Sequence, residues 1–545
     1  MYECPNCGGN LRFDISSQQL ACGYCNAGYD PYEIAKDKDA EESTNYEVTV
    51  FTCPQCAGEI YSTDNTAAGF CSFCGASTIL TSRLRKEKRP DFIIPFQKTK
   101  EDCKTEYIKR VRRAVFAPKE LQHPEKIDSF RGIYMPYWVY HFTQKGPLHL
   151  KGTKEHRRGD YIIKEHYILT GDIDNHYKGL SYDASSSFAD NISERIAPFD
   201  VKNMKSFTPS ILSGFYADIP DVGKEIYQPD AEKEANEQTE LYLKRSREVS
   251  KYSIESSGNA SEQYHTRCEE TNVAMFPVWF MSYRNQDRVA YATVNGQTGK
   301  VVADLPVDIK KYMLGSFILA LPLFILLNLF FTMVPVVSLG ITAVIAMIVT
   351  ILYQWEMKRI AQKESYEEDK GVQEAIRKKR QAEREAAAAL DGMAPYVTTN
   401  QHIPKKKKKK KLFSVAMWVI GGIVVWNIIS FLYAALQIFG VSGGSVIFIW
   451  IALVVTLIFG IKSLVKVKNI TAKKGIPGSV WTMSALILAS VVAFIKPTAD
   501  IYYYISNILC LVAVFFALLD LISGYNILAT RPLPQFEYRG GDDRA

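Results

Sequence analysis

The chain has 545 residues and a formal net charge of +7, with 47% hydrophobic and 23% charged residues. At roughly 100–200 residues per domain, this length predicts several domains. The charge is segregated, because residues 1–82 carry 3 basic and 11 acidic side chains whereas residues 356–411 carry 16 basic and 9 acidic ones. Long charge-free apolar runs follow residue 312, and this segregation of charge and apolar residues excludes a single soluble globule.

Eight of the 11 cysteines form two matching sets near the N-terminus. In each set, two Cys-x2-Cys pairs are separated by 14 residues, and the sets repeat with a period of 49 residues. Such paired knuckles place four thiolates around Zn²⁺, at Zn–S distances of about 2.3 Å. We therefore predict two zinc ribbons, at residues 1–40 and 50–82, each with one structural zinc. The predicted ligands are Cys4, Cys7, Cys22 and Cys25 in the first ribbon and Cys53, Cys56, Cys71 and Cys74 in the second.

Other uses of these cysteines have to be weighed. A disulfide framework would need an oxidising compartment, and an iron–sulfur site would also use four thiolates. Nucleic-acid binding depends on Lys and Arg neutralising phosphates, but residues 1–82 have a net charge of −8. Two Zn(Cys)₄ centres would lower this further, to about −12. The charge therefore favours a structural role or protein contact over nucleic-acid binding. The isolated cysteines are predicted to be ordinary buried or interfacial residues: Cys103, Cys268 and Cys510.

The soluble region continues after the ribbons. Residues 83–90 are interpreted as a basic linker, and residues 91–311 as a cytoplasmic α+β domain. Helices are predicted over residues 100–116 and 230–248. The predicted strands are Gly132–Phe142, Leu148–Lys151, Tyr161–Gly171, Tyr252–Glu255, Val273–Arg284, Arg288–Asn295 and Lys300–Val302.

One motif occurs twice in this domain. Met135–Trp138 (MPYW) matches Phe276–Trp279 (FPVW) at an offset of 141 residues. Each copy is predicted to be a strand that follows a helix and leads into a hairpin. We infer a possible internal duplication, in which two related halves pack around the two tryptophans; chance similarity between apolar strands is the alternative.

No residue pattern in this domain predicts catalysis. Five histidines lie between His141 and His176, but they lack the spacing of an HExxH motif or a facial triad. The sequence has no GxxxxGK[ST] phosphate loop and no GxSxG elbow, and Ser185-Ser186-Ser187 indicates a loop. We therefore predict no catalytic residues, no small-molecule substrate and no enzyme activity.

Apolar runs dominate the C-terminal half. Residues 313–355 are too long for one crossing, which takes roughly 20 residues, so they predict two transmembrane helices with a turn near Pro335. Four further runs predict four more helices within residues 412–523, for about six in total. These runs are Leu412–Ile438, Val446–Ile461, Val480–Ile495 and Ile501–Ser523. The expected fold class is a multidomain membrane protein with two small β zinc ribbons, an α+β domain and an all-α membrane region.

The placement of Lys and Arg orients these spans, because cytoplasmic loops carry an excess of basic residues. The loop 356–411 has 16 basic residues and the loop 462–478 has five lysines, whereas the opposite connections are nearly uncharged. With six spans, both termini are expected in the cytoplasm, including a tail at residues 524–545. Asp520 is ionisable, but it lies near the cytoplasmic end of the last span. Since intramembrane ionisable residues mark ion paths, its position argues against a transporter.

The charged loop 356–411 predicts a helix over Glu356–Met393 that continues from the second span, followed by the poly-Lys run Lys405–Lys411. The simplest role of this loop is to fix the topology. Binding to anionic lipid headgroups, at about 1 kcal/mol per lysine near the surface, is a second possibility. Contact with the acidic ribbons is a third.

The order of motifs resembles a known family. The tandem ribbons precede Ile94-Pro95-Phe96, the MPYW strand, Ser213–Asp218 (SGFYAD), the FPVW strand and Asn295–Val301 (NGQTGKV). This order resembles the tandem zinc-ribbon membrane proteins of Gram-positive bacteria, whose relatives accompany phage-shock-protein-A-like, TPM-domain and SPFH-domain (flotillin-like) proteins in envelope-stress operons. The resemblance extends to about residue 330, and it includes all eight ribbon cysteines. Ala57 departs from the pattern, which has Gly after the second knuckle cysteine.

The resemblance implies a role in membrane assembly rather than a reaction. We expect a non-enzymatic multi-pass protein of the bacterial plasma membrane, whose zinc ribbons and α+β domain mediate protein–protein assembly in an envelope-stress or flotillin-like complex. Its expected partners are membrane lipids and SPFH-, TPM- or phage-shock-type proteins. A membrane-tethered zinc-ribbon protein that binds nucleic acid is the alternative, and a transporter or membrane enzyme of unknown substrate is a second one.

Overall fold

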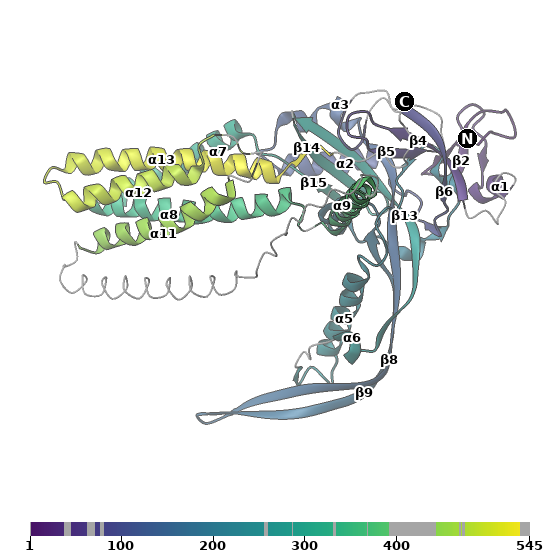
Figure 1. Ribbon diagram of the computed structural model, residues 1–545, viewed down its shortest axis with the longest axis horizontal. Helices are drawn as coiled ribbons and strands as arrows, with labels where there is room; N and C mark the ends of the chain where they lie inside the picture. Colours follow the sequence, from purple (N-terminus) through teal and green to yellow (C-terminus); the bar gives the residue numbers. More distant parts are fainter. Residues whose placement is uncertain are drawn as a thin grey trace. The chain divides into compact units, whose positions relative to one another are not determined.

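The chain folds into two compact units in the computed structural model (Figure 1). The first unit comprises residues 1–305, 366–378 and 530–545, and the second comprises residues 306–365 and 379–529. The structure describes residues 2–36, 45–62, 71–76, 81–254, 260–285, 287–330, 334–367, 369–391, 443–467, 470, 473 and 475–534.

The first ribbon is a three-stranded sheet that packs into the core of the first unit. Its elements are β1 (Leu11–Asp14), β2 (Gln19–Cys22), β3 (Gly28–Tyr29) and a short helix, α1 (Pro31–Lys36). Leu11 and Phe13 are buried in the main hydrophobic cluster of the unit. The backbone N–H of Phe13 donates to the Ser213 carbonyl at 3.0 Å, and the Ser213 hydroxyl donates to the Leu11 carbonyl at 2.6 Å. These bonds join the ribbon to a segment about two hundred residues further along the chain.

The second ribbon belongs to a larger sheet. Its strands are β4 (Asn45–Thr52), β5 (Glu59–Ser62) and β6 (Thr81–Lys88). The interpretation of residues 83–90 as a basic linker is wrong, because β6 pairs with β4 along its whole length, from Thr81 opposite Thr52 to Lys88 opposite Asn45. β6 stands at one end of the strand order, and charged side chains are common on such edge strands because they discourage pairing with other chains. Its basic composition therefore fits an edge strand as well as a linker.

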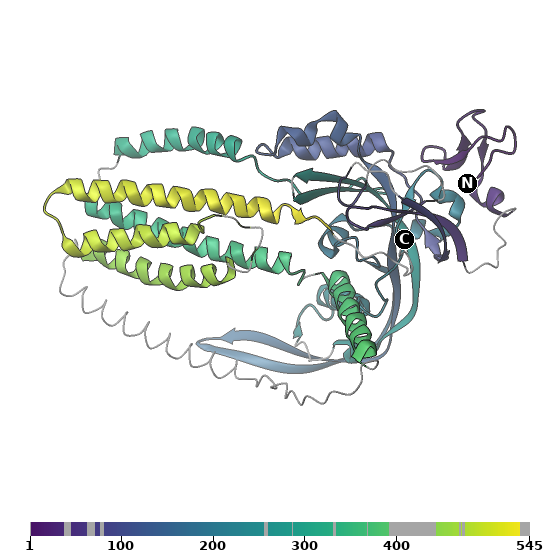
Figure 2. The ribbon, with the colours of Figure 1, turned by 45° about the horizontal axis from the view of Figure 1, so that its top comes forward.

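The large sheet has 13 strands among the described residues. Its other strands are β7 (Phe92–Ile93), β8 (Arg131–Arg158), β9 (Tyr161–Asp183), β10 (Lys205–Ser206), β11 (Tyr216–Ala217), β12 (Ser253–Ile254), β13 (Thr266–Asn285), β14 (Arg288–Asn295), β15 (Val301–Ala303) and β16 (Arg531–Pro532). The central order is β10-β7-β13-β8-β11-β5-β4-β6, and β9 pairs with β8. The two strands expected at 132–142 and 148–151 form one strand, β8. β13 pairs with β8 only as far as Gln144, so β8 and β9 continue beyond it as an arm that projects from the sheet (Figures 1 and 2).

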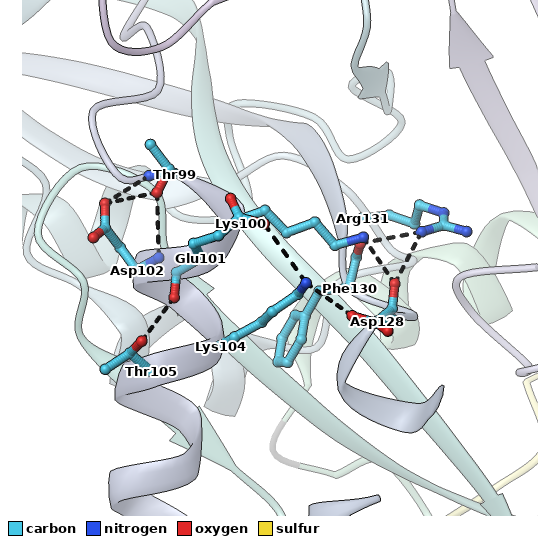
Figure 3. Close-up of polar contacts among 9 residues, drawn as sticks. All are labelled: Thr99, Lys100, Glu101, Asp102, Lys104, Thr105, Asp128, Phe130 and Arg131. Atoms are coloured by element: carbon cyan, nitrogen blue, oxygen red, sulfur yellow. Dashed lines mark hydrogen bonds and ion pairs between the residues drawn. The ribbon is translucent and has the colours of Figure 1, made fainter. Parts of the chain in front are cut away.

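Helices α2 and α5 form where the sequence predicted helices, over residues 100–116 and 230–248, whereas the three shorter helices of this region were not predicted. The helices are α2 (Lys100–Arg113), α3 (Pro124–Ile127), α4 (Asp190–Ile196), α5 (Gln228–Arg245) and α6 (Ala260–Gln263), with short 3-10 turns at Lys119–Gln122, Val201–Asn203 and Pro209–Leu212. Thr99 and Asp102 start α2 as a capping box: the Thr99 hydroxyl oxygen accepts from the Asp102 N–H at 3.2 Å, and the Asp102 carboxylate accepts from the Thr99 N–H at 3.0 Å (Figure 3). Lys104 then pairs with Asp128 at 2.8 Å and holds α2 to the turn that precedes β8 (Figure 3).

The two copies of the repeated motif lie on neighbouring antiparallel strands. Met135 on β8 stands opposite Phe276 on β13, its own counterpart at the offset of 141 residues. The first half contains β7 and β8, and the second half contains β11 and β13. β11 runs parallel to β8, and β7 runs parallel to β13, so each half contributes a short strand that pairs with the long strand of the other half. The indole N–H of Trp138 donates to the Val222 carbonyl ahead of α5, and that of Trp279 donates to the Lys98 carbonyl ahead of α2, both at 2.8 Å. The pairing is as symmetric as a duplication would make it, while common descent of the halves stays a prediction.

The second unit contains, in the part that the structure describes, five helices long and apolar enough to cross a membrane. They are α7 (Ile309–Phe330), α8 (Pro335–Glu364), α11 (Gly443–Val467), α12 (Gly478–Ile495) and α13 (Asp500–Leu528). The predicted span Leu412–Ile438 lies outside the described residues. α8, α11, α12 and α13 share a cluster rich in buried alanines, and small residues of this kind allow close helix packing in membranes. By contrast, none of residues 309–326 of α7 is buried.

Two stretches that follow membrane helices fold into the first unit. α8 ends at Glu364, Tyr366 has a φ of 53°, and α9 (Lys370–Asp391) begins after this break. The prediction of one continuous helix over Glu356–Met393 is therefore wrong, because a left-handed residue interrupts it. The C-terminal stretch supplies β16, which pairs with β14, so part of the predicted tail 524–545 is a strand of the sheet.

Candidate metal centres

Each cysteine pair sits in a turn of the same shape. The residue after the second cysteine has a positive φ in all four turns, and its N–H donates to the carbonyl of the first cysteine at 2.8–3.0 Å. These residues are Gly8 (φ 71°), Asn26 (56°), Ala57 (57°) and Gly75 (72°). The turns direct both thiols of a pair toward the same point. Ala57 adopts the same left-handed conformation as the two glycines.

The geometry of the sulfur atoms fits a tetrahedral metal ion. In the first cluster the Sγ atoms of Cys4 and Cys25 are 3.6 Å apart, and those of Cys7 and Cys22 are 3.4 Å apart. In the second cluster the corresponding distances are 3.8 Å for Cys53–Cys74 and 3.7 Å for Cys56–Cys71. A tetrahedron with Zn–S bonds of about 2.3 Å has sulfur atoms about 3.8 Å apart. The cysteines are all free, and sulfur atoms in a disulfide would be only about 2.05 Å apart.

Burial distinguishes the two clusters. All four cysteines of the second cluster are buried, whereas Cys7 of the first is exposed. The second cluster packs with Phe51, Ile60 and Phe73, and the Tyr291 hydroxyl on β14 donates to the Phe73 carbonyl at 2.9 Å. The second centre is therefore part of the core of the large sheet, while the first lies at the surface of the unit.

The histidines form no further metal site in the described part of the chain. The two cysteine clusters are the groups there whose ligand atoms come close enough together to hold one ion. The run Ser185-Ser186-Ser187 is a loop, as predicted, and its hydroxyls donate to Asp218 and Asp221. These bonds hold the loop against the SGFYAD segment.

Asp520 lies inside the helix bundle of the second unit. Its carboxylate accepts the backbone N–H of Gly478 at 2.7 Å and the Tyr353 hydroxyl at 2.8 Å, and it lies 3.2 Å from the Lys473 ammonium. The Lys473 Nζ is also 4.5 Å from the centre of the Tyr353 ring. These contacts join α8 and α13 to the start of α12, so Asp520 has a clear role in helix packing.

The structure also assembles a group of buried carboxylates that the sequence did not predict. Asp183, Asp190 and Asp369 are 2%, 7% and 8% exposed. Asp183 ends β9, Asp190 begins α4, and Asp369 lies between α8 and α9. No sequence signal could have grouped them, because the membrane helices α7 and α8 separate Asp369 from Asp183 and Asp190 along the chain.

Comparisons with known proteins give one significant similarity. The chain is 27% identical over 312 residues to the uncharacterized protein YdjG of Bacillus subtilis (strain 168), which covers 56% of this chain and 90% of YdjG. No protein-family model matches the chain, and no solved structure matches it. The similarity to YdjG thus concerns little more than half of this chain.

Proposed function

We propose that this protein is a multi-pass protein of the bacterial plasma membrane whose first unit binds two structural zinc ions and mediates protein–protein assembly rather than a reaction. The observation that carries the proposal is the pair of four-thiolate clusters. Four thiolates occupy every corner of a tetrahedral ion, whereas a catalytic zinc keeps one position open for water or substrate. Zinc bound in this way stabilises a fold and the surface that it presents.

The proposed topology has six spans and cytoplasmic termini. Residues 366–378 and the strand β16 both belong to the first unit. If that unit lies on one side of the membrane, the chain makes an even number of crossings before each of them. α7 and α8 are two crossings, but α11, α12 and α13 are three. The span that the sequence predicts at Leu412–Ile438, which lies outside the described residues, would make this number even, and the basic loops favour a cytoplasmic first unit.

The first ribbon is the proposed contact surface. Tyr24, between its last two cysteines, is 83% exposed, and Cys7 is exposed as well. Tyrosine is enriched among the residues that contribute most to protein interfaces. The net charge of −8 over residues 1–82 favours a partner with a basic surface over a nucleic acid. The resemblance in motif order supports SPFH-, TPM- or phage-shock-type proteins as these partners, together with membrane lipids.

Affinity purification of the full-length chain from crosslinked native membranes tests the proposal. We expect a protein of these three types to be recovered with the wild type, lost with Tyr24→Ala, and retained with Tyr161→Ala. Tyr161 is a matched control because it is 78% exposed at the tip of the β8–β9 arm. Recovery of none of the three types would contradict the named partners. Salt-sensitive recovery of DNA or RNA that is lost in Cys7→Ser would favour the nucleic-acid alternative.

A further inference from the structure

Helix α4 binds both stretches that return from the membrane helices. The backbone N–H of Lys370, after α8, donates to the Asp190 carboxylate at 2.8 Å. The Arg531 guanidinium, after α13, donates to the Asn191 side-chain carbonyl at 2.6 Å. Asp190 and Asn191 are the first two residues of α4. This one turn of helix therefore holds the cytoplasmic continuations of two membrane helices.

We call the contacts of α4 with Lys370 and Arg531 the junction. On the Arg531 side of the junction, the positive charge of Arg531 faces the negative charge of Asp304. Arg531 is 8% exposed, and its guanidinium lies 3.7 Å from the Asp304 carboxylate and 5.4 Å from the centre of the Tyr291 ring. Its backbone is part of β16, and Arg288 donates to the Thr530 carbonyl beside it at 3.1 Å. Strand pairing and an ion pair thus fix the C-terminal stretch.

The other side of the junction has an excess of negative charge. Asp190 accepts the Tyr227 hydroxyl at 2.6 Å in addition to the Lys370 N–H. Asp369 accepts the Val372 N–H at 2.9 Å and so caps the start of α9. The Oδ2 atom of Asp183 is buried and has no hydrogen-bond partner among the described residues. A buried carboxylate oxygen without a partner is costly when it is charged, and much less so when the group is protonated.

The groups around Asp183 and Asp190 come from several elements. Tyr137 on β8 stands opposite Asp183, and Ser193 on α4 lies beside it. Glu194 on α4, Tyr227 just before α5 and Asp230 at its start lie near Asp190. The nearby cations have other partners, since the Lys370 ammonium pairs with Asp230 and Arg531 pairs with Asp304. Lys370 attracts Asp190 and Arg531 attracts Asp369, but each cation is shared with another carboxylate, so negative charge remains in excess among the three buried carboxylates.

This geometry raises the pKa values of the buried carboxyl groups. Burial raises the pKa of Asp183 well above its usual range, and repulsion from Asp190 and Asp369 raises it further. Burial and repulsion from Asp190 also raise the pKa of Asp369 to about 6. The docked junction therefore binds protons more tightly than the separated residues would.

We propose that Asp183, Asp190 and Asp369 form a proton-operated latch that holds residues 366–378 against the first unit and releases them as the cytoplasmic pH rises. Because the pKa of a docked carboxyl lies above its ordinary value of about 4, docking takes up a proton. The contribution of that proton to docking is complete at low pH and is lost as the pH rises through the raised pKa. Release would free the segment that directly follows α8, and so couple the membrane helix to cytoplasmic pH.

Hydrogen–deuterium exchange of the full-length protein in nanodiscs tests the latch. The readout is the protection of peptides within residues 366–378 between about pH 5 and 8, a range that includes the raised pKa of Asp369, corrected for the intrinsic exchange rate. We expect the equilibrium constant for local opening to rise by up to about tenfold per pH unit for each proton released. Peptides from β14 serve as an internal reference and should keep a constant corrected protection.

Two variants separate a titrating latch from a merely structural contact. Asp183→Asn removes the charge at nearly constant volume and should abolish most of the pH dependence, and Asp183→Ala serves the same purpose if the first variant does not fold. Asp174→Asn, at an exposed position on the same strand, should keep the wild-type slope. A flat wild-type profile, or an unchanged slope in the Asp183 variant, would overturn the proposal. Zinc content measured at each pH keeps this outcome distinct from failure of the metal centres, on which the proposed function rests.

Discussion

The two cysteine clusters have one spacing and one turn geometry, yet they lie in different surroundings. The clearest contrast is between Tyr24 and Phe73, which occupy equivalent positions 49 residues apart. Tyr24 is 83% exposed and Phe73 is 3% exposed, with its ring edge-to-face on Phe280 at 6.3 Å. A ribbon repeated in sequence can thus serve as a core element at one site and as a surface at the other. The difference depends on the sheet that receives the second ribbon, and not on the ligands.

The largest effect should follow from removing a ligand of the buried centre. Cys53→Ser should release the second zinc and leave a cluster of thiols inside the sheet. We expect the first unit to lose roughly 4 kcal/mol or more, and its Tm to fall by about 10 °C. Cys7→Ser at the exposed centre should release one zinc with a loss of about 1–2 kcal/mol. Metal analysis and thermal unfolding of the two variants check this contrast, and equal losses of Tm would contradict it.

The next largest effect is a loss of stability that comes from packing alone, with metal binding unchanged. Phe73→Ala leaves all eight cysteines in place but opens a cavity beside Phe280, and should cost about 3–5 kcal/mol. Its matched control is Tyr24→Ala, which should change the stability by less than about 0.5 kcal/mol because the ring is exposed. Chemical denaturation of both variants, with zinc content unchanged, measures the difference. A large loss for Tyr24→Ala would show that the first ribbon packs as tightly as the second.

The two metals should also leave at different rates. A chelator reaches a ligand through local opening, and an exposed ribbon opens at a lower free-energy cost than a buried one. We expect zinc from the first cluster to be released at least about ten times faster than zinc from the second. A chromogenic chelator should therefore give two phases of one equivalent each. Cys7→Ser should remove the fast phase, and loss of the slow phase instead would reverse the assignment.

The cysteine clusters were predictable because each depends on a local spacing that fixes its own turn geometry. The strand Arg288–Asn295 and the starts of α2 and α12 were also close to their predicted places, since caps and apolar periodicity are local signals. The strand β6 was missed, because its basic residues resemble a linker until β4 is seen beside it. The sequence also did not predict the buried group formed by Asp183, Asp190 and Asp369, because these residues are far apart in the chain and meet only in the folded structure. Burial and pairing depend on tertiary contacts, and one sequence does not display them.

The smallest expected effect concerns the turn that has alanine after its second cysteine. Ala57 and Gly8 are equivalent in the two ribbons, and both have a left-handed backbone, with φ of 57° and 71°. Alanine in that conformation carries a cost of about 1 kcal/mol that glycine avoids. Ala57→Gly should therefore stabilise the first unit by about 0.5–1 kcal/mol after the greater entropy of glycine in the unfolded chain is counted.

Gly8→Ala is the reciprocal test of this conformational cost. A Cβ atom added at Gly8 would meet no other atom within 4 Å, so the expected loss of about 1 kcal/mol would come from the backbone alone. Denaturant unfolding at constant zinc content measures both variants. Because the two turns share one geometry, the two changes should be opposite in sign and similar in size. A loss of stability for Ala57→Gly would mean that the methyl group of Ala57, which is 9% exposed, contributes more by packing in the buried ribbon than its backbone conformation costs.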